Sequence, residues 1–447
     1  MLSKIDFMYN VKHIWHLTYP IILTLLAQNL VNLTDSAFLG RVGEVELGAS
    51  ALAGVFYMAV FVVGMGFSSG SQILIGRRNG EQNYRQIGNI FNQGMIFAIL
   101  LALIVFVLSF FLAAPLLRSF VHSHAVCNAT VEYLNFRIFG FFFAFINLIF
   151  RAFYVGIMRT KVLTLSAFIT TGVNVALNYP LIFGHWGLPA LGIGGAALAS
   201  VIAEAATTLF YFIFTCKVVD TKRFGLFTLQ QFSWQTIRQI LDISLFIMMQ
   251  IFLSVSTWFL FFMFIEQTGE RPLAVSNIIR SLYSLLGLPV MAFGQTISTI
   301  VSNLIGEGRT EEVLPTIRRQ FRIALGAVIP LALFAVLFPR VLASIYTNND
   351  ALITATIPSM YVFCGVLFVF AFGCIWFNAL SGTGNTRMAL LFDATTLVMY
   401  MTYNYVVNFV FHWPVAVAWV SEIVYWLSLG IMCYLYFRFG NWRARKI

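Results

Sequence analysis

An acidic side chain, Asp35, lies near the end of the first long apolar segment, in the stretch QNLVNLTDSAFLGRVG. The segment is almost uncharged from Trp15 onward, so at 1.5 Å per residue Asp35 is expected about 30 Å along a helix. A carboxylate at membrane depth costs about 2.5–3.5 kcal/mol on insertion scales. Such groups are kept where they face a water-filled cavity, bind a cation or carry a proton. We therefore expect Asp35 to bind a proton or a cation; the alternative is an interfacial aspartate that caps the helix.

Two asparagines, Asn174 and Asn178, are four residues apart and so share one face of a helix. Their amide oxygens could coordinate a sodium ion, and their side chains could hold a carboxylate by hydrogen bonds. Ser200, in the stretch GGAALAS, could add a hydroxyl. The expected coupling site for H⁺ or Na⁺ consists of Asp35, Asn174, Asn178 and Ser200, with any sodium ion at Asp35, Asn174 and Asn178. The alternative for the two asparagines is ordinary hydrogen bonding between helices.

Pro20 precedes Asp35 by fifteen residues in the same segment. Proline has no amide hydrogen and weakens the hydrogen-bond ladder of a helix. We therefore predict that Pro20 is a hinge, at which the first helix bends differently when Asp35 is loaded and when it is empty.

Other acids lie in apolar segments and are functional candidates by default. Glu204 in ASVIAEA and Glu422 in AWVSEIV occupy matched positions in the two halves of the chain, so they could also be a structural inheritance. Asp393 lies six residues after Arg387 and is either interfacial or part of a substrate cavity.

Adaptable side chains suit a cavity that accepts substrates of many shapes. The expected lining of such a cavity comprises Gln28, Met65, Phe141, Tyr283, Met291, Tyr361 and Asp393. The alternative for each apolar member is core packing or lipid contact, since the chain holds 47 Phe and 15 Met.

The composition identifies the surroundings in which these side chains must be positioned. The 447 residues are 60% hydrophobic and only 10% charged, whereas soluble domains are about 25% charged. The net charge of +10 does not indicate nucleic acid, because the basic residues lie between apolar segments. The five cysteines show no metal-binding spacing. The chain is therefore predicted to be an all-α integral membrane protein that needs no cofactor.

The chain holds enough apolar segments of about 20 residues for twelve membrane-spanning helices. Strands are not expected, because the segments lack the alternation of a membrane barrel. The predicted spans are 15–38, 47–72, 89–113, 129–154, 163–184, 192–215, 240–265, 273–303, 323–346, 354–380, 389–411 and 416–437.

The basic residues predict the orientation of these spans. With the N-terminus in the cytoplasm, 21 of the 27 Lys and Arg fall on the cytoplasmic side and 6 on the other. This asymmetry favours both termini inside and an even number of spans. The start of the chain resembles no cleavable signal peptide, so the first span is expected to act as its own insertion signal.

The two halves of the chain repeat each other at an offset of 226 residues. GIMRTKVLTL at 156–165 aligns with GTGNTRMALL at 382–391, and Asn178-Tyr179 aligns with Asn404-Tyr405. Six spans per half give parallel repeats around a central cavity that opens to each side in turn. We predict two six-helix lobes, 1–222 and 223–447.

These motifs together resemble the multidrug and toxic compound extrusion (MATE) transporters, in the superfamily that also holds lipid-linked oligosaccharide flippases. The resemblance covers nearly the whole chain and rests on Pro20, Asp35 with FLGRVG, and the stretches GMGFSSGSQILIGRRNG, GIMRTK, VNVALNYP, LGIGGAALAS, FGQTISTIVSNLIGEG and SGTGNTR. It implies cation-coupled export of cationic and amphipathic compounds by two six-helix lobes. It also implies that Asp35 is the coupling residue of the N-terminal lobe.

The chain departs from the family pattern at two acids. One bacterial branch has a glutamate in the seventh span, where this chain has Ser254 and, one turn earlier, Gln250. Another branch has an aspartate in the fifth span, where this chain has Asn178. The coupling ion is therefore left open between H⁺ and Na⁺.

The function expected from these observations is antiport of small amphipathic or cationic substrates by a monomeric, multi-pass protein of the plasma membrane, most simply a bacterial inner membrane. A flippase for a lipid-linked saccharide is the nearest alternative, although flippases of that kind favour more cationic cavities. An integral-membrane enzyme would need clustered His, Ser or paired acids at one membrane face, and the six histidines form no such cluster. A channel is less consistent with two repeated lobes, which favour alternating access.

Overall fold

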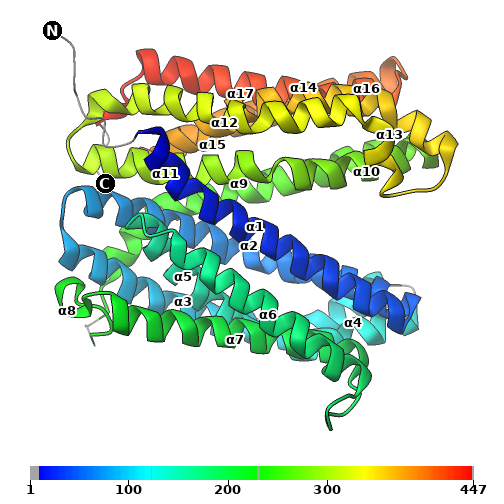
Figure 1. The fold of residues 1–447 in the computed structure, drawn as a ribbon, viewed down its shortest axis with the longest axis horizontal. Coiled ribbons are helices and arrows are strands. Elements are labelled where there is room, and N and C mark those ends of the chain that lie inside the picture. Colours follow the sequence, from blue (N-terminus) through cyan, green and yellow to red (C-terminus); the bar gives the residue numbers. More distant parts are fainter. Residues whose placement is uncertain (1–9, 122, 229–231, 445–447) are drawn as a thin grey trace. The chain divides into compact units, whose positions relative to one another are not determined.

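A computed structural model describes residues 10–121, 123–228 and 232–444 of the chain, and within these ranges all regular structure is helical (Figure 1). The helices of the first half are α1 (Val11–Val42), α2 (Glu44–Gly80), α3 (Tyr84–Phe120), α4 (His124–Arg137), α5 (Gly140–Gly156), α6 (Lys161–Phe183), α7 (Gly192–Val218) and the short α8 (Thr221–Phe224). Those of the second half are α9 (Trp234–Gln267), α10 (Glu270–Leu286), α11 (Leu288–Gly306), η1 (Thr310–Glu312), α12 (Val313–Leu337), α13 (Pro339–Ser344), α14 (Asp350–Gly382), α15 (Thr386–Tyr405), η2 (Val406–Val410), α16 (Val415–Ala418), α17 (Val420–Phe439) and η3 (Trp442–Ala444).

The helices are long and apolar enough for a multi-pass membrane protein. Ten described helices could each cross a membrane by length and composition, and α4 with α5, bent by 53°, would form an eleventh span. The segment that completes the predicted twelve is α15 with the π-helical turn η2, whose lower hydropathy reflects side chains such as Arg387, Asp393 and Asn404.

Three predicted spans differ in detail from the observed helices. The predicted span 129–154 is broken between α4 and α5, just before Gly140, and the predicted span 273–303 is broken at Gly287. Glycine is a poor helix former, and this lowers the cost of a break at both places. The predicted span 323–346 ends early, because α12 stops at Leu337 and Pro339 begins a new short helix.

The helix ends bear out the internal repeat. Adding 226 to both ends of α2 gives Glu270 and Gly306, which are the ends of the α10–α11 pair. The same offset carries the ends of the α4–α5 pair onto Asp350 and Gly382, the ends of α14. The breaks do not correspond, however: α2 and α14 are continuous where their counterparts are divided. The two halves therefore share one plan but bend at different helices.

The chain folds into two compact units that do not follow the midpoint of the sequence. We call Leu23–Ser244 the N-unit, and the described residues up to Ile22 together with those from Leu245 onward the C-unit. The divisions fall inside α1 and α9, so each unit contains the beginning of a helix whose remainder belongs to the other unit. The predicted boundary between the two lobes, at 222/223, falls within α8 and stays a prediction about the repeat.

Contacts inside each unit explain this exchange of helix beginnings. In the C-unit, the Thr18 hydroxyl donates a hydrogen bond to the Thr296 hydroxyl at 3.1 Å. In the N-unit, the Asn89 amide donates to the Thr236 hydroxyl at 3.1 Å, and the Ser244 hydroxyl donates to a carbonyl of α2 at 3.4 Å. Buried polar pairs of this kind help to fix the position of a helix in an apolar core.

Packing within each unit has a clear centre. In the N-unit, α2 packs against α3, α4 and α5, while α6 pairs with α7 along its length. In the C-unit, α14 packs against α10, α11, α12 and α17. A large apolar cluster fills the C-unit around this helix, with the rings of Phe363, Phe370, Tyr400 and Trp419 among its buried members.

Candidate functional site

The carboxylate of Asp35 lies in a short chain of hydrogen bonds within the N-unit. The Asn178 side-chain amide donates to Asp35 Oδ1 at 2.5 Å and also to Asn174 Oδ1 at 3.1 Å. Asn174 in turn donates to the Ser200 hydroxyl at 3.1 Å. Asp35 itself is half-buried, whereas the two asparagines are fully buried. The structure thus brings together all four residues of the expected coupling site.

Small residues on α7 allow these side chains to meet. α7 begins with the sequence GIGGAALAS, and a Cβ atom at Gly195 would collide with the Leu181 carbonyl of α6. Glycine and alanine permit such close approach of helix backbones. Ser200 is thereby held against Asn174, and the one-turn spacing of the asparagines carries the chain of hydrogen bonds on to Asp35.

Oxygen atoms dominate the surroundings of the Asp35 carboxylate. Asn178 Oδ1 is buried and has no hydrogen-bond partner, so it is available as an acceptor or ligand. With the carboxylate, Asn174 Oδ1 and the Ser200 hydroxyl, it gives a set of oxygen donors of the type that hard cations take. Within the described ranges, no group of three or more His, Cys, Asp or Glu could hold a metal ion. The arrangement suits a single proton or a monovalent cation.

A second polar network begins one turn further along α7. The Glu204 carboxylate forms a two-bond ion pair with Arg137 of α4, at 2.7 and 3.0 Å. The Arg137 guanidinium also lies over the ring of Tyr57, 3.9 Å from its centroid. The Tyr57 hydroxyl donates to Glu204 Oε1 at 3.4 Å. Glu204 is therefore neutralised by an internal cation.

Among the described residues of the C-unit, the buried acids Asp393 and Glu422 form no ion pair of this kind. Asp393 accepts a hydrogen bond from the Tyr425 hydroxyl at 2.6 Å and one from the Ser254 hydroxyl at 3.4 Å. Asp393 from α15 therefore places a carboxylate beside Ser254 of α9. Glu422, on α17, accepts hydrogen bonds from two tryptophan side chains.

The residues expected to line a substrate cavity are placed differently from one another. Gln28, Met291 and Tyr361 are exposed, and Met65 is half-buried. Phe141 and Tyr283 are buried inside the N-unit and the C-unit respectively. Phe141 stacks on Tyr57, and the Tyr283 hydroxyl accepts a hydrogen bond from Trp426. Asp393 is buried as described above. Their role in substrate binding stays a prediction.

Pro20 is buried within α1, and the helix continues through it from Val11 to Val42. It lies two residues before the division between the units, so the C-unit contains Pro20 and the N-unit contains Asp35 on the same helix. The predicted hinge is thus a proline inside an unbroken helix.

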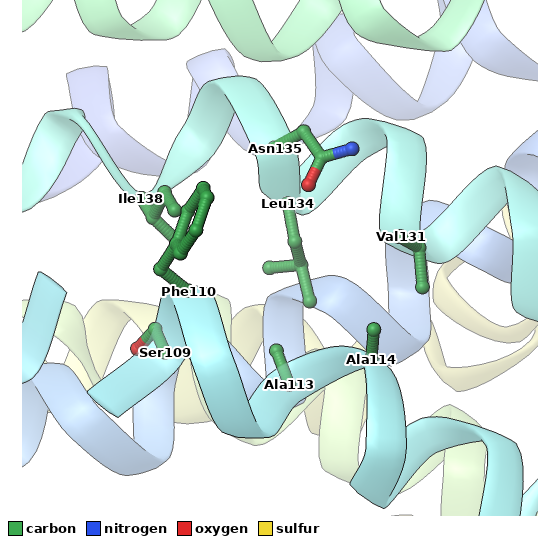
Figure 2. Close-up of a pocket in the computed structure, with 8 residues that line it drawn as sticks. All are labelled: Ser109, Phe110, Ala113, Ala114, Val131, Leu134, Asn135 and Ile138. Atoms are coloured by element: carbon green, nitrogen blue, oxygen red, sulfur yellow. The ribbon is translucent and has the colours of Figure 1, made fainter. Parts of the chain in front are cut away.

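A small pocket lies elsewhere in the N-unit, between α3 and α4 (Figure 2). Its lining includes Ser109, Phe110, Leu134 and Asn135, and none of its residues is ionisable. It shares no residue with the Asp35 site.

Sequence reasoning did not find the Arg137–Glu204 pair. From the sequence, Glu204 was identified only as one of two matched acids, with no partner. The available signal was the presence of an arginine and a glutamate in separate apolar spans, because buried charges are usually paired. For Asp393 the signal was weaker, because its partners Ser254 and Tyr425 are uncharged hydroxyl side chains of a kind that is common in apolar spans.

Comparison with known proteins agrees with this architecture. The sequence model of the MatE family matches residues 20–180 and 246–410. The probable multidrug resistance protein NorM of Thermotoga maritima is 24% identical over 443 residues, covering 98% of this chain and 94% of that protein. The corresponding protein of Agrobacterium fabrum is 27% identical over 355 residues, covering 78% of this chain and 76% of that protein.

The fold is also found among solved structures. The outward-facing structure of a multidrug resistance MATE family transporter of the MOP superfamily superposes with a TM-score of 0.88 at 20% identity, covering 96% of this chain and 95% of that one. The likeness confirms the predicted all-helical, twelve-span fold class. With both repeats matched by the family model, the chain belongs to the MatE family, which is a family of membrane transporters and not of enzymes.

Proposed function

We propose that the chain is a secondary active multidrug transporter that exports organic cations or amphiphiles in exchange for H⁺ or Na⁺ bound at Asp35. The relatives that it resembles are described as probable multidrug resistance proteins, which supports the substrate class. The cluster around Asp35 contains one carboxylate, hydrogen-bonded to Asn178, and Asn178 is in turn hydrogen-bonded to Asn174. A single negative charge suits a proton or a monovalent cation.

The observation that carries the proposal is the hydrogen bond from Asn178 to Asp35, at 2.5 Å, beside an unpartnered amide oxygen. A carboxylate in a low-dielectric site must be compensated by hydrogen bonds or by a cation. The amide of Asn178 supplies one hydrogen bond and leaves the remaining charge for an ion to neutralise. Loading of a proton or sodium ion removes the cost of closing protein around the carboxylate.

The proposed cycle uses α1 as the connection between ion and movement. Asp35 and Pro20 lie on the same unbroken helix, in the N-unit and the C-unit respectively. Neutralisation of Asp35 changes the polarity of one half of the helix, and the missing backbone hydrogen bond at Pro20 provides a place for the helix to bend. Substrate release and ion uptake then alternate, as in transporters built from two repeats.

The test is efflux of a fluorescent organic cation from proteoliposomes with independently imposed pH and sodium gradients. We expect one of the two gradients to drive efflux by the unaltered protein, and Asp35→Asn to abolish that response while leaving membrane insertion normal. Efflux that responds to neither gradient would contradict antiport. Full gradient-driven efflux by Asp35→Asn would contradict the assignment of Asp35.

A bacterial inner-membrane location, cytoplasmic termini and a monomeric state belong to the same proposal.

A further inference from the structure

The duplicated halves contain a matched tyrosine–glutamate pair, and the two copies differ in charge. Glu204 and Glu422 lie at corresponding positions of α7 and α17. The offset of 226 that relates α2 to the α10–α11 pair also relates Tyr57 to Tyr283, and the shorter loop before α17 reduces the offset to 218 at the two glutamates. Tyr57 donates a hydrogen bond to Glu204, and Tyr283 shares the indole N–H of Trp426 with Glu422.

The arginine that neutralises the first copy is absent from the second. The same offset carries Arg137 onto Phe363. Where the Arg137 guanidinium lies over the Tyr57 ring, the Phe363 ring lies against Tyr283, with centroids 5.8 Å apart. Phe363 is fully buried, so the place of the cation is filled by an apolar side chain.

Glu422 is consequently a buried carboxyl without an internal counter-ion. It is 3% exposed, and no Lys, Arg or His of the described residues lies within ion-pair distance of its carboxylate. Of the two basic residues of α10, Arg271 donates to the Ala351 carbonyl at 2.7 Å, and Arg280 is exposed and directs its guanidinium over the ring of Phe262. An unpaired charge in such a site is costly unless the group is neutralised.

The atoms around Glu422 indicate how it is neutralised. Trp258 of α9 donates its indole N–H to Oε1 at 3.1 Å, and Trp426 donates to Oε2 at 3.2 Å. The Tyr400 hydroxyl of α15 lies beside the carboxyl, is buried, and makes no hydrogen bond of standard geometry. A sodium ion needs several oxygen ligands, whereas two of the groups on this carboxyl are N–H donors that repel a metal cation.

We propose that Glu422 is a second, proton-binding site, separate from Asp35 and built into the C-unit by the replacement of an arginine by Phe363. A proton adds to one carboxylate oxygen, and the new O–H donates a hydrogen bond to the Tyr400 hydroxyl oxygen, which otherwise has no hydrogen-bond partner. Loss of the proton leaves a carboxylate held by the two indole N–H groups. Both states have partners, so the site can exchange a proton without rearranging the core.

Other titratable groups around Glu422 must be distinguished from it. Those that interact with Glu422 or with its partners are Tyr283 of α10, Cys374 of α14, Asp393 and Tyr400 of α15, and Tyr425 of α17 itself. Asp393 is the nearest rival as a proton acceptor, since Tyr425 links its carboxylate to the same helix.

The two tryptophans that bind Glu422 are reporters of its charge. The full-length protein is labelled with 5-fluorotryptophan and studied by ¹⁹F NMR. Its nine tryptophans give nine fluorine resonances, and those of Trp258 and Trp426 are assigned by their loss in Trp258→Phe and Trp426→Phe. We expect both resonances to shift together between pH 5 and 9 in the unaltered protein. The shift should be lost in Glu422→Gln and retained in Asp393→Asn. Retention of the full shift in Glu422→Gln, or its loss only in Asp393→Asn, would overturn the proposal, as would resonances that do not move in the unaltered protein.

Two further measurements separate this site from sodium and from Asp35. Replacing K⁺ with Na⁺ at constant ionic strength and pH 8 is expected to leave both resonances in place, and a sodium-induced shift that Glu422→Gln removes would overturn the assignment to a proton. Asp35→Asn should leave the titration unchanged even where it abolishes efflux, so the two proposals fail independently. If Glu422→Gln does not fold, Phe363→Arg, which restores the missing cation, should hold both resonances at their alkaline positions, and normal titration in that variant would count against the proposal.

Discussion

The matched acids Glu204 and Glu422 allow one stability prediction to be made with an internal control. Glu204→Gln removes the carboxylate from a two-bond ion pair and leaves the Arg137 guanidinium uncompensated. Breaking one partner of a buried pair costs about 3–5 kcal/mol. The two side chains here retain 12% and 18% of their exposure, so we expect the lower end of that range, about 3 kcal/mol.

The same substitution in the second half should be much milder. Glu422→Gln keeps an oxygen that can accept an indole N–H, and it leaves no buried cation behind. A typical hydrogen bond contributes about 1 kcal/mol, so a loss of that size or less is expected. The two variants thus change one carboxyl to an amide at corresponding positions with different electrostatic surroundings.

The assay is reversible unfolding of purified protein in mixed detergent micelles, with the free energy of unfolding compared across both variants. Arg137→Met combined with Glu204→Gln completes a double-mutant cycle, because it removes the guanidinium that the single variant strands. We expect the double variant to recover much of the lost stability. Equal losses for Glu204→Gln and Glu422→Gln, or additive losses in the cycle, would refute the reasoning from charge pairing.

Three further outcomes are expected. Asn178→Leu removes a hydrogen bond to a charged group, worth roughly 1.5–3 kcal/mol, and should weaken gradient-driven efflux more than ten-fold with normal insertion; unchanged proteoliposome efflux would count against a role beside Asp35. Pro20→Ala restores a backbone donor in a helix where proline costs about 3 kcal/mol, so it should slow transport while raising thermal stability, and faster transport would contradict a hinge. Gly195→Val places a branched side chain against the Leu181 carbonyl and should lower the free energy of unfolding by about 1–3 kcal/mol, whereas Gly172→Ala, in open space on α6, should raise it by up to about 1 kcal/mol because alanine is the better helix former.

Much of the architecture follows from the sequence because the membrane imposes simple length and charge rules. Apolar runs of about 20 residues predict spans, and the offset of 226 recovers the ends of α2 and α14 in the opposite half. Local spacing also predicts that Asn174 and Asn178 share a face. Their position relative to Asp35 was accessible only as a hypothesis, since it depends on how α1 lies beside α6.

The features that the sequence did not predict depend on contacts between distant residues. Arg137 and Glu204 are separated by 67 positions, and no local pattern shows that their side chains meet. The breaks before Gly140 and at Gly287 were also missed, because hydropathy continues through both. The difference between Glu204 and Glu422 became visible only when Arg137 could be placed over Tyr57 and Phe363 against Tyr283.

The exchange of helix beginnings between the two units has a consequence for how such a chain could arise. The division inside α1 falls after Ile22, twelve residues into that helix, and the division inside α9 falls after Ser244, eleven residues into its helix. In a half-length ancestor with this architecture, the start of the first helix would have no helices of its own chain to pack against. Two copies would satisfy each other by swapping those starts, as in domain-swapped homodimers. Gene fusion would then have joined partners that already depended on one another to fold.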